Sequence, residues 1–72
     1  MTPRAPRVTA LQVMRVLESH SFQVVRQKGS HAIMRNEVGK RVTVPVHAGR
    51  TLHPKVLASI MRDAGLSADD FE

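Results

Sequence analysis

The hydrophobic and polar positions of the chain change their period twice along its length. Over residues 9–20 the apolar side chains recur at helical spacing, and Thr9 is a typical helix N-cap residue. Over residues 22–47 the pattern becomes β-branched and largely alternating, which is typical of strands. Helical spacing returns over residues 54–65, where Pro54 suits the first position of a helix and a glycine suits its end. The sequence therefore predicts a helix, a stretch of strands and a second helix.

Two turn signals divide the alternating stretch into three parts. One is the tripeptide Lys28-Gly29-Ser30, and the other is the loop over residues 36–40. Pro45 has no N–H to give to a ladder, so the third strand is expected at an edge of the sheet or to leave the sheet near that residue. The expected strands are residues 22–27, 31–36 and 41–47.

We expect a mixed α+β fold of order α-β-β-β-α, formed by residues 1–72 as a single domain. Both helices must bury an apolar stripe, and a three-stranded antiparallel sheet offers one apolar face, so both helices are expected on the same face. The residues expected to point toward that layer are Phe22, Val24, Ala32, Met34, Val42, Val44 and Val46 from the strands, and Leu11, Met14, Leu17 and in part Val13 and Val16 from the first helix. The residues expected on the opposite face are His31, Arg35, Arg41, Thr43 and His47.

Charge is distributed unevenly along the chain. The formal net charge is +5, but all eleven Lys and Arg residues stand in residues 1–62, where the acids are only Glu18 and Glu37. The other four acids follow, and we expect residues 67–72 to form an acidic C-terminal tail. A basic body of this kind attracts polyanions, above all a phosphate backbone, and it would also steer in an acidic partner protein.

The composition excludes several classes of protein. The chain has no cysteine, which excludes disulfides, iron–sulfur clusters and thiol chemistry and suits a reducing compartment. No apolar run reaches the length that crosses a bilayer, and the start of the chain has no apolar signal-peptide core. We therefore expect a cytoplasmic protein without a membrane segment, whose residues 1–7 are flexible.

The tripeptide Gly29-Ser30-His31 is the place where the sequence suggests chemistry. RNA carries its own nucleophile, the 2′-hydroxyl, so cleavage requires a base, positive charge around the phosphate and an acid for the leaving oxygen. An imidazole titrates near neutral pH and can serve as base or acid. The glycine leaves room for a phosphate, and Lys28 together with Arg26 or Arg35 could bind that phosphate or its neighbours. On spacing alone, the alternative is a turn followed by an ordinary exposed strand histidine.

Several motifs together resemble a known family. They are the run FQVVRQKGSHAIMRN, the strand end Val44-Pro45-Val46-His47 and the helical pattern before Ala64-Gly65-Leu66. Over residues 9–67 they resemble the HicA toxin family of bacterial toxin–antitoxin systems. The expected element order is also similar to that of the double-stranded-RNA-binding domain. Family members often carry a glycine before the aromatic residue of the first strand, where this chain has Ser21.

The resemblance implies a toxin that cleaves mRNA, an endoribonuclease with a double-stranded-RNA-binding-like fold. It places the catalytic histidine at His31, and it implies a HicB antitoxin that covers the active site. We expect the toxin alone to be a monomer and to form a hetero-oligomer with that antitoxin. The residues expected to bind single-stranded mRNA are Arg26, Lys28, Gly29, Ser30, Arg35, Lys40, Arg41 and His47.

The other three histidines are weaker candidates. His47 is a second candidate for proton transfer, or else a surface residue at a strand end. His20 and His53 stand at expected helix boundaries, where they would terminate and cap a helix. The four histidines match no common zinc-ligand spacing and have no carboxylate nearby, so neither a metal nor another cofactor is expected.

Two other functions remain open on the sequence. One is a non-catalytic RNA-binding module of double-stranded-RNA-binding shape, with the same charge and no chemistry. The other is a protein-interaction domain whose basic face serves only an acidic partner. Incubation with single-stranded and duplex RNA separates them, because products identify a nuclease, binding without products favours the module, and a salt-insensitive failure to bind favours the interaction domain.

Overall fold

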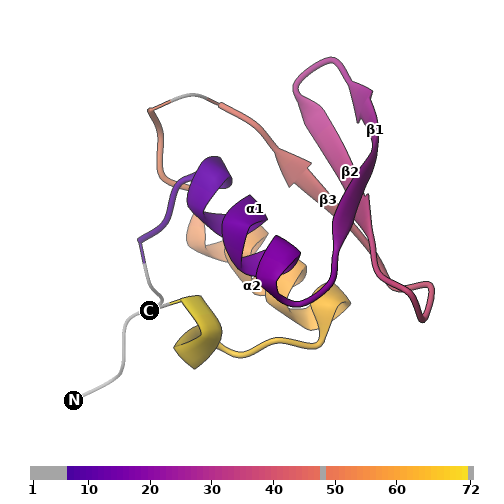
Figure 1. The fold of residues 1–72 in the computed structure, drawn as a ribbon. Coiled ribbons are helices and arrows are strands. Elements are labelled where there is room, and N and C mark those ends of the chain that lie inside the picture. The colour runs from indigo at the N-terminus through magenta and orange to yellow at the C-terminus, as the bar shows by residue number, and fades with distance from the viewer. Residues whose placement is uncertain (1–6, 48, 72) are drawn as a thin grey trace.

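The computed structural model describes residues 7–47 and 49–71, and its elements follow the order α-β-β-β-α (Figure 1). The elements are α1 (Ala10–Ser19), β1 (Gln23–Lys28), β2 (His31–Arg35), β3 (Arg41–Pro45), α2 (Pro54–Ala64) and the short 3-10 helix η1 (Ala68–Phe71). The α+β class and the element order expected from the sequence are confirmed.

The three strands form one antiparallel sheet in the order β1-β2-β3. β2 and β3 pair without a break, from His31 opposite Pro45 to Arg35 opposite Arg41. Pro45 is the last residue of the edge strand β3, which is where its missing N–H does least harm to the ladder. Both helices lie on one side of the sheet and pack against β3, so the opposite face is left uncovered (Figure 1).

The helix side of β2 and β3 is buried. Ala32, Met34, Val42 and Val44 each expose 1% of their surface or less. Phe22, which precedes β1, is also buried, and Val46 is partly buried against the same core. The helices and η1 complete this core with Ala10, Val13, Leu17, Leu57, Ile60, Ala64 and Phe71. Burial of these side chains is the main force that holds the helices on the sheet.

Two residues that were expected in the core are exposed. Val24 on β1 is 45% exposed, although it lies opposite the buried Met34. Since the helices pack chiefly against β3, at the far edge of the sheet, they do not cover β1. Leu11 is 60% exposed, because the buried stripe of α1 runs through Ala10, Val13 and Leu17, of which only Ala10 was not expected.

The two ends of α1 use side-chain and backbone caps. The Thr9 hydroxyl accepts a hydrogen bond from the Gln12 N–H at 3.3 Å, and the Gln12 side chain accepts one from the Thr9 N–H at 2.8 Å. At the other end, the Phe22 N–H donates to the Leu17 carbonyl at 2.9 Å, in a Schellman arrangement. Ser21 has a φ of 70° there, a left-handed conformation that favours glycine.

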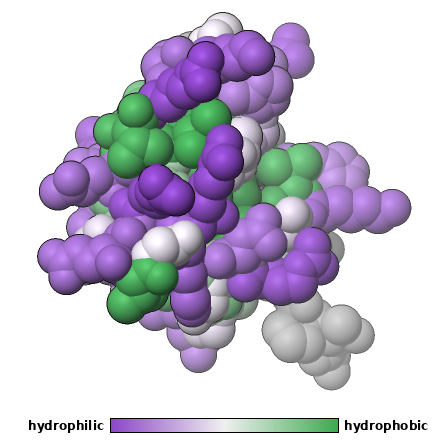
Figure 2. All heavy atoms as spheres, turned by 90° about the vertical axis from the view of Figure 1, so that its right-hand side faces the viewer, coloured by the Kyte–Doolittle hydropathy of each residue, from purple (hydrophilic) through white to green (hydrophobic). Residues whose placement is uncertain are grey.

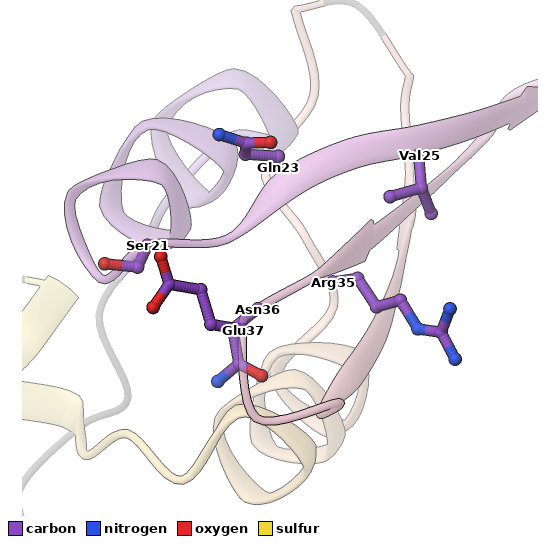
Figure 3. A pocket seen from close by; sticks show the side chains of 6 residues that line it. All are labelled: Ser21, Gln23, Val25, Arg35, Asn36 and Glu37. Carbon is purple, nitrogen blue, oxygen red and sulfur yellow. The ribbon is translucent and has the colours of Figure 1, made fainter.

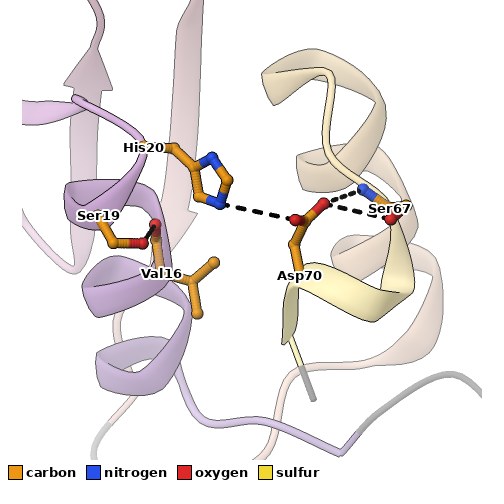
Figure 4. Close-up of polar contacts among 5 residues, drawn as sticks. All are labelled: Val16, Ser19, His20, Ser67 and Asp70. Carbon is orange, nitrogen blue, oxygen red and sulfur yellow. Dashed lines mark hydrogen bonds and ion pairs between the residues drawn. The ribbon is translucent and has the colours of Figure 1, made fainter.

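The C-terminal part of the chain folds back on the core. The His53 Nδ1 accepts a hydrogen bond from the Lys55 N–H at 3.1 Å and caps α2, as the sequence predicts. After α2, the residues from Ser67 to Phe71 form a capped turn, and the Phe71 side chain is only 5% exposed. Asp70 accepts hydrogen bonds from Ser67 and lies 3.7 Å from the His20 ring (Figure 4). The expected acidic tail therefore packs against the body as far as it is described, while residues 1–6 and Glu72 lie outside the described residues.

Candidate nucleic-acid interface

The uncovered side of the sheet, called the outer face below, is rich in cations. Strand alternation and the pairing register place its members, because their neighbours along β2 and β3 point into the core. They are Gln23, Val25, Arg26 and Lys28 from β1, His31, Ile33 and Arg35 from β2, and Arg41, Thr43 and Pro45 from β3. Seen from the sheet side, the surface is mostly hydrophilic, with a few hydrophobic groups set among the polar ones (Figure 2).

A β-bulge in β1 determines on which face of the sheet two of these cations lie. The pairing of β1 with β2 skips Val25, which is the extra residue between Val24 and Arg26. Under strict alternation Arg26 and Lys28 would share the helix side with Val24. The extra residue returns both to the outer face, where Lys28 lies directly opposite His31. No period in the sequence signals this bulge.

His31 is exposed at the start of β2, between two neighbours in register. Lys28 on β1 lies on one side of it and Pro45 on β3 on the other. The next residue, Ala32, is fully buried, so the imidazole of His31 points to the outer face. A ligand that approaches from solvent therefore meets an imidazole on β2 and, from the opposite position on β1, a lysine.

A two-residue turn fixes where β2 begins. Gly29 has a φ of 57° and Ser30 has a negative φ, which is the pattern of a type II′ hairpin turn. The Gln27 side-chain amide donates a hydrogen bond to the Gly29 carbonyl at 3.1 Å, and the Val46 N–H donates one to the Ser30 carbonyl at 2.6 Å. A Cβ at position 29 would meet nothing within 4 Å. The glycine is therefore needed for its backbone conformation, and the turn holds His31 in place.

Two arginines face each other at the other end of the outer face. Arg35, the last residue of β2, lies directly opposite Arg41, the first residue of β3. Together with Arg26 they border a hollow of about 240 Å³ whose other lining residues are Val25 and Ile33. The sequence had singled out the three arginines, but neither apolar residue. For Ile33 the alternation of β2 was a usable signal, whereas Val25 reaches this face through the bulge.

Lys40 and His47, also expected at the site, differ in their positions. Lys40 stands in the turn between β2 and β3, and its Nζ lies beside the C-terminal end of α2, where exposed carbonyls favour a cation. His47 follows β3 and lines a hollow of about 300 Å³ together with Pro45 and His53, and Pro45 is also the register neighbour of His31. The structure thus brings Arg26 and Lys28 to the face that His31 occupies, while the Lys40 side chain lies at the end of α2.

The described residues contain no evident metal site. Within residues 7–47 and 49–71, no three His, Asp or Glu side chains come together in a group that would hold a metal ion. The helices of the described part of the chain are too short and too polar to cross a membrane.

Comparison with models of protein families gives a match over most of the chain. The model of the family described as HicA toxin of bacterial toxin–antitoxin matches residues 11–66 of the 72-residue chain. The matched segment contains all three strands and the whole of α2. A search of curated proteins finds no match.

Proposed function

Since the chain belongs to the HicA toxin family and is therefore the toxin of a bacterial toxin–antitoxin system, we propose that it acts as an endoribonuclease on mRNA with His31 as its catalytic residue. The toxin has an antitoxin as its partner, because toxins of this kind occur in such pairs. Cleavage of mRNA in the cytoplasm would stop translation and arrest growth.

The observation that carries the proposal is the position of His31. Its imidazole is exposed on the outer face, opposite Lys28, with Arg26 on the next outward position of the same strand. The cations attract the RNA backbone and neutralise charge that develops on the phosphate, and an imidazole is a group that can act as general base and as general acid. Neither group would serve this purpose on the buried face.

The proposed reaction uses the ribose as nucleophile. The neutral His31 ring takes the proton of a 2′-hydroxyl while the 2′-oxygen attacks the adjacent phosphorus. Lys28 and Arg26 offset the negative charge on the phosphate oxygens as the bond from phosphorus to the 5′-oxygen breaks. The imidazolium, or a water that it protonates, returns a proton to the leaving 5′-oxygen. The products are a 2′,3′-cyclic phosphate and a 5′-hydroxyl, and the step requires no metal.

Assay of RNA cleavage by the His31→Ala variant tests the proposal. Removal of a general acid or base is expected to slow cleavage by about 10² to 10⁴-fold. Because the ring is exposed, circular dichroism should show an unchanged fold. Wild-type cleavage should persist in a chelator, and a substrate with 2′-deoxyribose at the cleaved position should resist cleavage.

His20→Ala is the matched control, because this histidine lies beside Asp70 on the helix side and not on the outer face. Its cleavage rate should stay within a few-fold of wild type. Full cleavage by His31→Ala would overturn the assignment of the catalytic residue. Binding of RNA by wild type without any product would favour the non-catalytic module instead.

We further propose that the antitoxin is of the HicB type and covers the outer face. An acidic surface on it would complement Lys28, Arg26 and the arginines beyond them. Mixing the two proteins should stop cleavage and protect β1 and β2 from hydrogen exchange. A complex that leaves His31 accessible to solvent would contradict this part of the proposal.

A further inference from the structure

The arginines at the far end of the outer face stand well away from His31 along the sheet. Arg35 is four positions after His31 on β2, which places their backbones about 13 Å apart at the rise of a β-strand. Arg35 and Arg41 border the hollow that Val25 and Ile33 also line, whereas His31 lies opposite Lys28 at the other end of the face. The two arginines therefore have surroundings of their own.

These two arginines oppose each other at a cost to the fold. Like charges directly opposite on neighbouring strands destabilise a sheet. In residues 7–47 and 49–71, neither Arg35 nor Arg41 forms an ion pair with an acid. The nearby Glu37 does not relieve them, since its carboxylate lies toward Ser21 while the Arg35 guanidinium points away from it (Figure 3). An anion from outside the chain would complete this arrangement.

The floor of the hollow indicates what that anion is attached to. Val25 is 57% exposed, and Ile33 beside it is partly buried. A free phosphate gains nothing from an apolar surface, whereas the flat face of a base would cover it and remove it from water. Guanidinium groups can also stack on a base as well as bind its phosphate.

We propose that Arg35 and Arg41, above the apolar floor of Val25 and Ile33, form a second nucleotide subsite that binds single-stranded RNA away from the cleaved bond. The inference rests on the proposed nuclease function and adds a requirement for substrate length. A span of about 13 Å corresponds to about four stacked nucleotides at 3.4 Å each, and to fewer in an extended strand. Duplex RNA is a poor fit, because its bases are stacked inside the helix and cannot reach the floor.

The test measures binding without cleavage. The His31→Ala protein is titrated with 2′-O-methyl RNA oligonucleotides of two, four and eight nucleotides, followed by fluorescence anisotropy. In this background, Arg35→Ala with Arg41→Ala should weaken binding of the eight-nucleotide strand about tenfold or more and leave the two-nucleotide strand almost unchanged. Loss of two phosphate contacts should also reduce the salt-dependence slope by about 1.4 for a single strand.

A matched control removes the same charge from the helix side of the molecule. The double variant Arg15→Ala, Lys55→Ala removes one exposed cation from α1 and one from α2. Its affinity for oligonucleotides of every length should stay within about threefold of that of the His31→Ala protein. Ile33→Ser should weaken binding of the eight-nucleotide strand but not of an abasic strand of the same length. Circular dichroism checks that each variant is folded.

Three outcomes would overturn the subsite. The first is that the control pair and the arginine pair lose affinity for RNA equally. The second is that the arginine pair loses affinity equally for all three oligonucleotide lengths. The third is that duplex RNA binds more tightly than single-stranded RNA. If wild type cleaves RNA while any of these holds, the nuclease proposal survives and the subsite fails. If wild type neither cleaves nor binds RNA, both fail.

Discussion

Alternate residues of β2 and β3 belong to the two faces of the sheet, and the two faces have different roles. On the helix side, Met34 and Val42 expose 1% of their surface or less and bring no polar atom into the core. On the outer side, the residues next to them in sequence include Arg35 and Arg41, which repel each other and bury little. The helix side thus holds the fold together, and the outer side keeps charge available for a ligand. Substitutions on the two faces should therefore affect different measurements.

The largest expected effect comes from neighbours on opposite faces of β2. Met34→Ala leaves a cavity in the core and should cost about 2 to 5 kcal/mol, whereas Ile33→Ala on the outer face should cost no more than about 1 kcal/mol. A chain of 72 residues has a total stability of about 4 to 10 kcal/mol, so Met34→Ala should lose a large fraction of it. Urea denaturation measures both. Equal losses would show that the faces do not differ as described.

The helix side of β2 and β3 could be predicted from the sequence because the alternation there is regular and both strands lie under the helices. The same reasoning was wrong at Val24, because an edge strand that no helix covers has no buried face. It was wrong at Leu11 because several apolar residues compete for one stripe of α1. The spacing of apolar residues alone cannot decide whether Val24 and Leu11 are buried, since this depends on which strands the helices cover.

The outer face could be predicted only in part. Alternation placed His31, Arg35 and Arg41 there, and the structure has them on that face. Arg26 and Lys28 arrive through a bulge, which one extra residue creates and which no spacing rule reveals. The roles of these residues in RNA binding and cleavage stay predictions, because they rest on chemistry that a fold does not test.

The joint between α1 and β1 provides the next test. Ser21 and Gly65 both occupy the left-handed position that ends a helix, at φ values of 70° and 72°. Ser21→Gly should stabilise the protein by about 0.5 to 1 kcal/mol, because it removes strain from a residue with a Cβ. Gly65→Ser should destabilise by about 1 kcal/mol for the same reason. Since both positions serve only the helix layer, the RNA cleavage rate of each folded variant should equal that of wild type.

A smaller effect on stability is expected from the opposed arginines. Arg41→Gln removes the like charge opposite Arg35 and should stabilise the protein by about 0.2 to 1 kcal/mol at low salt. The gain should shrink as salt screens the repulsion. Affinity for single-stranded RNA should fall at the same time. Thermal melts at low and high salt, with binding measured on the same samples, check whether this pair trades stability for binding.

The smallest expected effect is on the pH dependence of stability, and it involves only Asp70 on the helix side. The hydrogen bond from the Ser67 backbone N–H lowers the pKa of Asp70 below its ordinary value, and the Ser67 hydroxyl and the charge of His20 add smaller effects in the same direction, while desolvation acts against them. A carboxyl with a lowered pKa in the folded state stabilises the fold above its unfolded pKa, and this contribution is lost as the pH falls through the lowered value.

Asp70→Asn should therefore be slightly less stable than wild type at neutral pH, and the two should converge in strong acid. Asp69→Asn removes the same charge one residue earlier without a bond to Ser67, so it should follow wild type across the range. Urea denaturation from pH 7 down to pH 2 measures the difference. A constant gap between Asp70→Asn and wild type at all pH values would show that the carboxylate charge contributes nothing to the packing of η1.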